Sequence, residues 1–262
     1  GQTAARRPAR RGRRRGILRS MPLDEYRRKR DFAKTPEPAP GRIAPGRIAP
    51  GRIAPGGLAG PAVPTSRRRF VVQRHRATRL HYDVRLEIDG VLVSWAVPKG
   101  PTQDPDARRM AVHVEDHPVE YFDFEGVIPA RQYGAGDVIV WDWGTWEPEK
   151  ETPDPATAIG AGELKFRARG QKLNGRFTIV RTSRRPGTAP RTAFEDDEGE
   201  QWLLIKKRDE HAVAGWDAED HPQSVKSGRT NDEVKANAPA IWVSEAPAAT
   251  AEIDLAGALA AP

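Results

Sequence analysis

Cysteine is absent from this 262-residue sequence, as are long apolar runs and any segment with the form of a signal peptide. Without cysteine the chain forms no disulfides and offers no thiolate to a metal ion. Any bound metal must therefore be held by histidine and carboxylate side chains. The missing apolar runs exclude a membrane-spanning helix, and the missing leader argues against secretion. We expect a cytoplasmic protein, since the lack of cysteine also fits a reducing compartment.

Positive charge is distributed unevenly along the chain. The net charge is +7, but residues 1–30 hold 12 Lys and Arg against two acids, whereas residues 70–262 hold 24 basic and 32 acidic groups. A basic arm thus precedes a mildly acidic body, which favours a polyanion as partner. The eight arginines of residues 1–20 come without a single acid. We expect this arm to be disordered and to contact nucleic acid, the alternative being a solubilising tail.

Composition divides the chain into five parts. The Arg-rich arm covers residues 1–22, and a segment with a short helix over 23–30 continues to residue 40. Residues 41–66 contain GRIAP three times in tandem. Proline at every fifth position forbids helix or central strand, so this part is predicted to be an extended spacer. A β-rich domain follows over 67–217, and residues 218–262 form a C-terminal extension without an assigned function.

Short strands dominate the β-rich part. Residues 81–88 alternate strictly between polar and apolar, and Asp89-Gly90 is the two-residue turn of a tight hairpin leading into 91–97. Further strands are predicted at 109–115, 138–143, 162–167, 175–181 and 202–206. Seven or eight short strands with almost no helical periodicity imply a mainly β fold, an antiparallel sandwich or barrel.

The strand at 81–88 carries a candidate metal site. His81 and Asp83 lie two residues apart, so their side chains share one face. A short loop brings His75 back beside them, and two histidines with one carboxylate leave open positions on a divalent ion. Arg85, next on this face, is placed to clamp a phosphate with two donors. Any one of these residues alone favours an ordinary strand whose polar face meets solvent, but the four together favour a site. Substituting His81 or Asp83 should then remove ligands and leave the core intact.

A second group of titratable residues follows the strand at 109–115. Glu115, Asp116, His117, Glu120 and Tyr121 fall within seven residues beyond a strand end, where active-site groups often sit. Lys99 ends the preceding strand and is expected at the same rim. A salt-bridged loop explains this spacing equally well, so the spacing alone leaves both interpretations open.

Several longer motifs occur in one order: KRDF and TPEP, then RLHYDVRLE, SWAVPKGP, RRMAVHVEDHPVEY, FEGVIP, YGAG and QWLLIKKRDE. Over about residues 23–233 the chain resembles the 3′-phosphoesterase domain of bacterial DNA ligase D, in a stand-alone form. The resemblance implies a small antiparallel β-barrel with an N-terminal segment packed over the active site. It further implies a manganese-dependent enzyme, other divalent transition metals being acceptable, that heals DNA 3′ ends in non-homologous end joining.

Such an enzyme removes a terminal ribonucleoside from a primer strand, leaving a 3′-phosphate, and then hydrolyses that phosphate to a 3′-hydroxyl. The expected partners are DNA 3′ ends, together with a DNA ligase and end-joining factors, at the bacterial nucleoid and not at a membrane. The resemblance assigns the metal ligands to His75, His81 and Asp83. It assigns phosphate contact or catalysis to further residues: Arg85, Lys99, Arg109, His117 and Tyr121, with Gln73 and Glu115 in support and Arg30, Asp31 and Glu37 in the N-terminal segment.

The sequence departs from the family pattern beside His75, where Arg74 and Arg76 replace the frequent Lys and Asp, and at Gln132, where His is frequent. Arg76 would either weaken metal binding by like charge or strengthen substrate binding. Two other classes of function compete with the enzyme. One is a catalytically silent module that binds DNA ends and recruits a ligase, and the other is a structural barrel that binds a phosphate or metal unrelated to nucleic acid. The full set of ligand-type residues argues against the first, and the basic arm against the second.

Overall fold

The computed structural model of the protein describes residues 23–40, 68–182 and 200–237. The Arg-rich arm and the GRIAP repeats lie outside these residues. The expectations made for them therefore stay predictions.

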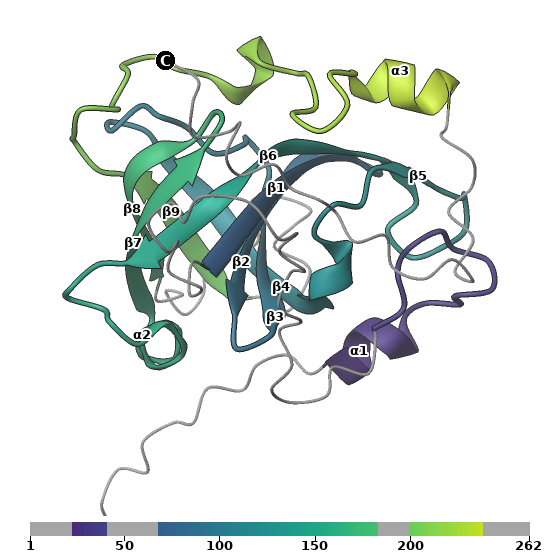
Figure 1. The fold of residues 1–262 in the computed structure, drawn as a ribbon, viewed down its shortest axis with the longest axis horizontal. Coiled ribbons are helices and arrows are strands. Elements are labelled where there is room, and N and C mark those ends of the chain that lie inside the picture. The colour runs from purple at the N-terminus through teal and green to yellow at the C-terminus, as the bar shows by residue number, and fades with distance from the viewer. Residues whose placement is uncertain (1–22, 41–67, 183–199, 238–262) are drawn as a thin grey trace, which may run out of the picture.

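Nine antiparallel strands form one sheet in the described part of the chain, and eight of them close into a barrel (Figure 1). The order around the barrel is β1-β2-β3-β4-β9-β8-β7-β6, and β6 pairs back with β1. The short β5 extends the sheet beside the first residues of β6. The predicted mainly β barrel is confirmed; the sequence pattern missed β5 because three residues carry no periodicity. The strands are β1 Arg68–Arg76, β2 Leu80–Ile88, β3 Val91–Val97, β4 Arg108–Pro118, β5 Gly126–Ile128, β6 Gly136–Pro148, β7 Glu163–Gly170, β8 Asn174–Arg181 and β9 Gln201–Lys206.

Helices are few and short in the described residues. α1 (Leu23–Arg28) packs on β4, α2 (Pro155–Ala161) on β7, and α3 (Asn231–Ala236) on β5 and β6. Two 3₁₀ turns, Val119–Tyr121 and Ala218–Asp220, complete the set. None of these helices has the length and apolarity that crossing a bilayer requires.

The barrel wall separates two apolar clusters. Phe70 and Val72 of β1 belong to the large cluster inside the barrel, whereas Val71 between them belongs to a second cluster with Tyr26 and Tyr121. The second cluster lies on the outer face of the wall, under α1 and the segment that follows β4. Strands β1–β3 are therefore buried on both faces.

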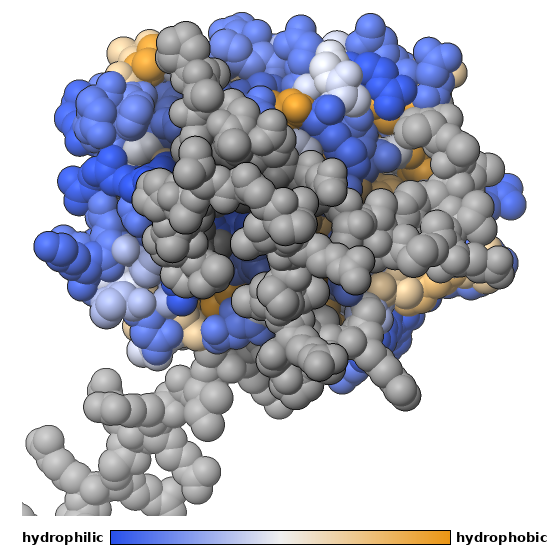
Figure 2. Space-filling view, in the orientation of Figure 1, coloured by the Kyte–Doolittle hydropathy of each residue, from blue (hydrophilic) through white to orange (hydrophobic). Residues whose placement is uncertain are grey.

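The described surface in Figure 2 is mostly hydrophilic, with hydrophobic residues in small separate patches.

Burial on both faces changes the interpretation of the strand at 81–88. β2 forms as predicted, but its polar face does not meet solvent: Asp83 is 6% exposed and Arg85 is 2% exposed. The hairpin turn is also confirmed, because Asp89 and Gly90 both have positive φ angles (50° and 83°) and Ile88 pairs with Val91. The pattern predicted the strand and its two faces correctly. It could not predict that the polar face is buried, because the residues that bury it are distant in sequence.

The C-terminal extension packs against the barrel as far as the structure describes it. Ala218 and Val234 are fully buried members of the inner cluster. The Asn231 side-chain amide donates to the main-chain oxygen of Arg74 (3.2 Å) and to the carboxylate of Asp137 (2.8 Å). Residues 218–237 thereby join β1 to β6 from one end of the barrel, and they are structurally continuous with it.

Strand β4 has an irregular pairing and a buried carboxyl group without a partner. Its pairing with β3 shifts register between Leu92 and Ser94. Asp116, in the shifted stretch, is 1% exposed, and neither of its carboxylate oxygens has a hydrogen-bond partner. Burial raises the pKa of Asp116 to about 7.

The packing of α3 yields a stability prediction. Val234→Ala removes two buried methyl groups from the inner cluster and should lower the free energy of unfolding by about 1.5–3 kcal/mol. The matched control is Val213→Ala, because Val213 is 50% exposed; it should change stability by less than about 0.5 kcal/mol. Urea unfolding measures both. Equal effects would show that the extension does not contribute to the stability of the barrel.

Asp116 yields a pH prediction. Its pKa of about 7 in the fold, against an ordinary 3.8, means that the native state binds the extra proton between these values. Stability should therefore fall by a few kcal/mol as the pH rises from about 4 to 7, at up to about 1.4 kcal/mol per pH unit. Asp116→Asn should remove this pH dependence, so the free energy of unfolding of the variant, relative to that of the wild type, should increase as the pH rises. The control Asp89→Asn, in the exposed turn, should follow the wild type. Parallel curves for the wild type and Asp116→Asn would contradict the assignment.

Candidate active site

Two histidines and an aspartate meet where β1 turns into β2. His75 of β1 lies directly opposite His81 of β2, two residues before Asp83. One ligand atom from each of the three residues lies within 4.8 Å of the others. Asp83 Oδ2 is 3.8 Å from His75 Nδ1, and Asp83 Oδ1 is 3.7 Å from His81 Nε2. The structure thus brings the three predicted metal ligands together.

The outer nitrogens of both histidines face main-chain carbonyls. His75 Nε2 lies 2.8 Å from the carbonyl oxygen of Gly134, and His81 Nδ1 lies 3.0 Å from that of Arg79. An N–H donated to each carbonyl means that the other ring nitrogen, the one facing Asp83, is the unprotonated one. Metal-binding histidines commonly have this arrangement. Two imidazoles and one carboxylate with open positions fit a divalent transition-metal ion.

Asp83 is held ionised by its neighbours. Burial acts to raise its pKa, but the guanidinium of Arg85 outweighs this and holds the pKa of Asp83 well below its ordinary value. Arg85 Nη2 donates to Asp83 Oδ2 at 3.0 Å. Burial lowers the pKa of His81, which favours the neutral ring that a metal needs. An ionised Asp83 and a His81 ring biased towards its neutral form are what a metal site requires.

Arg85 does not present the open two-pronged clamp expected from the sequence. Its donors already have partners: Nε donates to Gln73 (2.8 Å) and Nη1 to Ser94 (2.8 Å), in addition to the Nη2 bond to Asp83. Gln73 in turn donates to the carbonyl oxygens of Tyr121 and Phe124. Arg85 lines the cavity, but it also holds Asp83 in place and ties it to the segment after β4.

His117 and Tyr121 lie behind the metal ligands, as part of the second predicted group. His117 Nδ1 is 2.9 Å from Arg85 Nη1, and its ring packs edge-on against Tyr121 with 4.8 Å between centroids. Burial and the positive charges of Arg85 and Arg30 lower the pKa of His117 well below its usual range. Burial raises the pKa of Tyr121 well above its ordinary value. His117 is thus a neutral imidazole, and Tyr121 keeps its phenolic proton.

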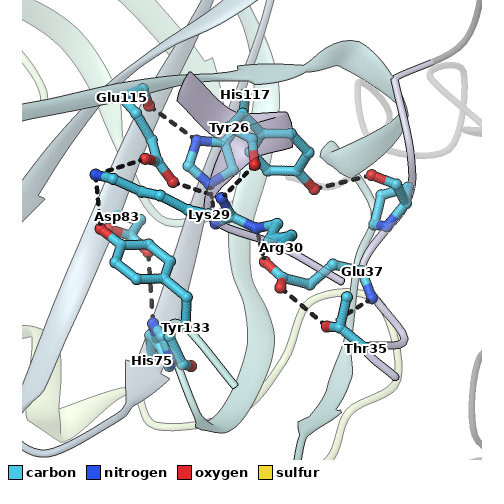
Figure 3. Close-up of polar contacts among 12 residues, drawn as sticks. Tyr26, Lys29, Arg30, Thr35, Glu37, His75, Asp83, Glu115, His117 and Tyr133 are labelled. Carbon is cyan, nitrogen blue, oxygen red and sulfur yellow. Dashed lines mark hydrogen bonds and ion pairs between the residues drawn. The ribbon is translucent and has the colours of Figure 1, made fainter. Parts of the chain in front are cut away.

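The N-terminal segment covers this group (Figure 3). Arg30 Nε donates to Glu37 (2.7 Å) and Nη1 to Glu115 of β4 (2.6 Å), while Lys29 Nζ lies 3.0 Å from the other oxygen of Glu115. Tyr26, fully buried, donates its hydroxyl to the main-chain oxygen of Pro38 at 2.8 Å. The predicted packing of this segment over the site is confirmed, with Glu115 as its main ionic anchor.

A cavity of about 180 Å³ lies between the N-terminal segment and the barrel wall. Besides the metal ligands, it is lined by predicted functional residues (Arg30, Glu37, Arg85, Glu115, His117 and Tyr121) and by apolar side chains of β3 and β4. Lys99, Arg109 and Asp31 are not in this lining. Lys99 is exposed, Arg109 lies 3.6 Å from Asp217, and Asp31 is half exposed and pairs with Lys34 at 3.0 Å. Their predicted roles stay predictions.

Sequence reasoning missed Tyr133, which lines this cavity, and Lys29, which contacts the lining residues Tyr133 and Glu115. Lys29 stands in the KRDF motif beside Arg30, but nothing in its spacing indicates that it reaches Glu115. Tyr133 belongs to the YGAG motif, but the spacing of this motif does not indicate that its tyrosine reaches the cavity. Its ring lines the cavity and lies 4.8 Å from Lys29 Nζ. The motifs themselves were the available signal for both.

The two arginines beside His75 are paired away from the metal ligands. Arg76 donates to Asp137 (2.7 Å) and to Asp232 of α3 (2.6 Å). Arg74 donates to Glu219 at 2.6 Å. Neither expected effect of Arg76 is needed to explain its presence, because acidic groups of β6 and the C-terminal segment compensate its charge.

Comparison with known proteins places this site in a family. Residues 73–181 match the model of the DNA ligase D 3′-phosphoesterase domain. The chain is 46% identical over 214 residues to the multifunctional non-homologous end joining protein LigD of Pseudomonas aeruginosa, an alignment that covers 80% of this chain and 22% of that protein. It is 44% identical over 161 residues to the multifunctional non-homologous end joining DNA repair protein LigD of Mycobacterium tuberculosis. That alignment covers 62% of this chain and 18% of that protein.

The matched residues include all three candidate metal ligands, together with Arg85 and the residues to which it donates. The chain spans about a fifth of the length of these relatives, so the comparison concerns one domain of each. It confirms the resemblance that the sequence motifs indicated. Residues 73–181 belong to the family of the DNA ligase D 3′-phosphoesterase domain.

Proposed function

We propose that this protein is a metal-dependent phosphoesterase that heals DNA 3′ ends in non-homologous end joining. The proposal rests on one observation: a single cavity is lined by a 2-His-1-carboxylate set, a neutral buried histidine and two guanidinium groups. Phosphoester hydrolysis needs these parts, because charge must be neutralised, a nucleophile deprotonated and a leaving oxygen protonated. The family match supports the same reaction class.

Manganese is the proposed metal, with other divalent transition ions as substitutes. His75 Nδ1, His81 Nε2 and one carboxylate oxygen of Asp83 would hold it, and mixed nitrogen and oxygen donors suit such ions. The bound ion would supply Lewis-acid stabilisation of charge on the phosphate.

The protein's own residues supply the remaining chemistry. Hydrolysis of a 3′-phosphate breaks the bond between phosphorus and the 3′-oxygen; the attacking water loses a proton, and the 3′-oxygen gains one. His117 is neutral, and its Nδ1 lies 2.9 Å from both the main-chain oxygen of Glu115 and Arg85 Nη1, so Nε2 is the atom that exchanges a proton. Arg30 lies 3.5 Å from this nitrogen and would bind a phosphate oxygen beside it. Arg85 fixes Asp83 and His117 relative to each other.

The proposed substrates are primer strands that end in a 3′-phosphate or a 3′-ribonucleotide. We further propose that the protein works beside a DNA ligase and end-joining factors in the bacterial cytoplasm, near the nucleoid. The names of the related proteins support end joining as the setting.

The direct test incubates the full chain with manganese and a labelled primer–template carrying either end. We expect conversion of the 3′-phosphate to a 3′-hydroxyl, and of the ribonucleotide end first to a 3′-phosphate. Binding without turnover of either substrate would favour the silent end-binding module instead.

His81→Ala should lower manganese affinity by more than ~100-fold and abolish both activities. Losing a group that only hydrogen-bonds to a ligand already costs roughly 10- to 100-fold, and losing the ligand itself should cost more. Titration calorimetry measures the affinity, and gel electrophoresis the activities. The matched control is Glu87→Gln, on the same strand face but outside the cavity and paired with Arg69 at 2.7 Å. Unchanged metal binding in His81→Ala would refute the metal site.

Asp83→Ala is a poorer test than the sequence suggested. Asp83 is buried and bonded to buried Arg85, so its removal leaves an uncompensated charge and should cost about 3–5 kcal/mol. The variant would lose the metal and much of the stability together.

The Arg-rich arm gives a separate prediction. Deletion of residues 1–20 should weaken DNA binding and reduce its salt dependence, since eight arginines are lost and the body beyond residue 70 is net negative. Each lost phosphate contact lowers the slope of log affinity against log salt by roughly one unit. Catalysis at saturating DNA should persist, because Lys29 and Arg30 remain. Unchanged affinity and slope would make the arm a solubility device.

A further inference from the structure

Tyr133 has an unusual position for a large aromatic side chain. Among the described residues, only Tyr133 and Val213 are large hydrophobic side chains classed as exposed, at 47% and 50%. Tyr133 is the one of the two that lines the cavity. Its exposure therefore occurs at the rim of the proposed active site.

The loop that carries Tyr133 is fixed to the metal ligands. The next residue, Gly134, has a φ of 73°, and its carbonyl oxygen contacts His75 Nε2 at 2.8 Å. Main-chain bonds from Gln132 to Pro129 and from Ala135 to Gln132 close the turn on either side. The backbone at Tyr133 thus keeps a set distance from the place where a phosphate would bind.

Cations of the N-terminal segment lie over the ring. Lys29 Nζ is 4.8 Å from the ring centroid and 3.3 Å from the hydroxyl, and the Arg30 guanidinium carbon is 5.1 Å from the centroid. Figure 3 shows the ring between Lys29 and His75. These contacts restrain the ring, and nearly half of its surface stays open.

The size of the cavity decides which part of a substrate reaches this ring. The volume is about 180 Å³, whereas pockets that enclose a drug-sized ligand start near ~300 Å³. A phosphate fits beside the metal ligands, but the nucleoside attached to it must remain at the rim. A restrained, exposed aromatic ring at the rim is a stacking surface, and every base offers a face to it whatever the sequence.

We propose that Tyr133 stacks on the terminal nucleoside of the DNA 3′ end and thereby determines affinity for ends that carry a base. This inference rests on the proposed function, since it assumes a 3′-phosphate in the cavity. The alternative is that Tyr133 acts only through its hydroxyl, by holding Lys29 near Glu115.

The experiment compares two primer–templates that both end in a 3′-phosphate, one with a normal terminal nucleotide and one with an abasic terminal sugar. Dissociation constants come from fluorescence anisotropy with chelator present, and KM and kcat from manganese-dependent turnover. The variants are Tyr133→Ala and Tyr133→Phe, with Val213→Ala as the exposed control, and circular dichroism checks the fold of each.

We expect Tyr133→Ala to weaken binding of the normal end by roughly 5- to 100-fold and to raise KM more than it lowers kcat. Its effect on the abasic end should be several-fold smaller, because that end offers nothing to stack on. Tyr133→Phe keeps the ring and should lose far less than Tyr133→Ala.

Equal losses on the two ends would overturn the proposal, as would a Tyr133→Phe variant as weak as Tyr133→Ala. Failure of the proposed function has a different signature, namely wild-type protein that turns over neither end. The anisotropy comparison still tests stacking in that case, and equal wild-type affinity for the two ends would exclude it.

Discussion

The buried guanidinium of Arg85 is the interaction on which the site depends. A buried cation is tolerated only when each donor has a partner, and a missing partner is costly. Arg85 is 2% exposed and donates to Asp83, Gln73 and Ser94. These residues come from three strands, so a single side chain fixes the metal carboxylate relative to the barrel wall. The contact with His117 extends the same network to β4.

This network explains why a polar strand face can lie inside the protein. The alternation at 81–88 is ordinary for a strand with one wet side. Here the wet side is covered by α1 and by the segment around Tyr121, which form the outer apolar cluster. Coverage excludes water from the ligands and strengthens every charge interaction among them. It also holds the pKa of His117 low, so that the imidazole is neutral inside a positively charged surrounding.

Sequence reasoning reached the fold and the grouping of His75, His81 and Asp83 because both are set by local pattern. Alternation and one Asp-Gly turn fix the β2–β3 hairpin, and i, i+2 spacing fixes the shared face of His81 and Asp83. Contacts between distant segments were not predictable in this way. Asp232 pairs with Arg76 across 156 positions, and Tyr133 meets Lys29 across 104. No period links such residues; only the closed barrel and its cover bring them together.

The charges around the cavity argue for the role of a metal in substrate binding. Three cations (Lys29, Arg30 and Arg85) face three carboxylates (Glu37, Asp83 and Glu115), and their nitrogen and oxygen atoms pair at 2.6–3.0 Å. Three positive and three negative charges cancel, so the side chains by themselves give little net attraction for a phosphate. The pairing instead holds the cations in place, which reduces the reorganisation that phosphate binding would require. A divalent ion between His75, His81 and Asp83 would make this balance positive by two charges. Attraction of an anionic DNA end into the cavity should thus be stronger with the metal bound than without it.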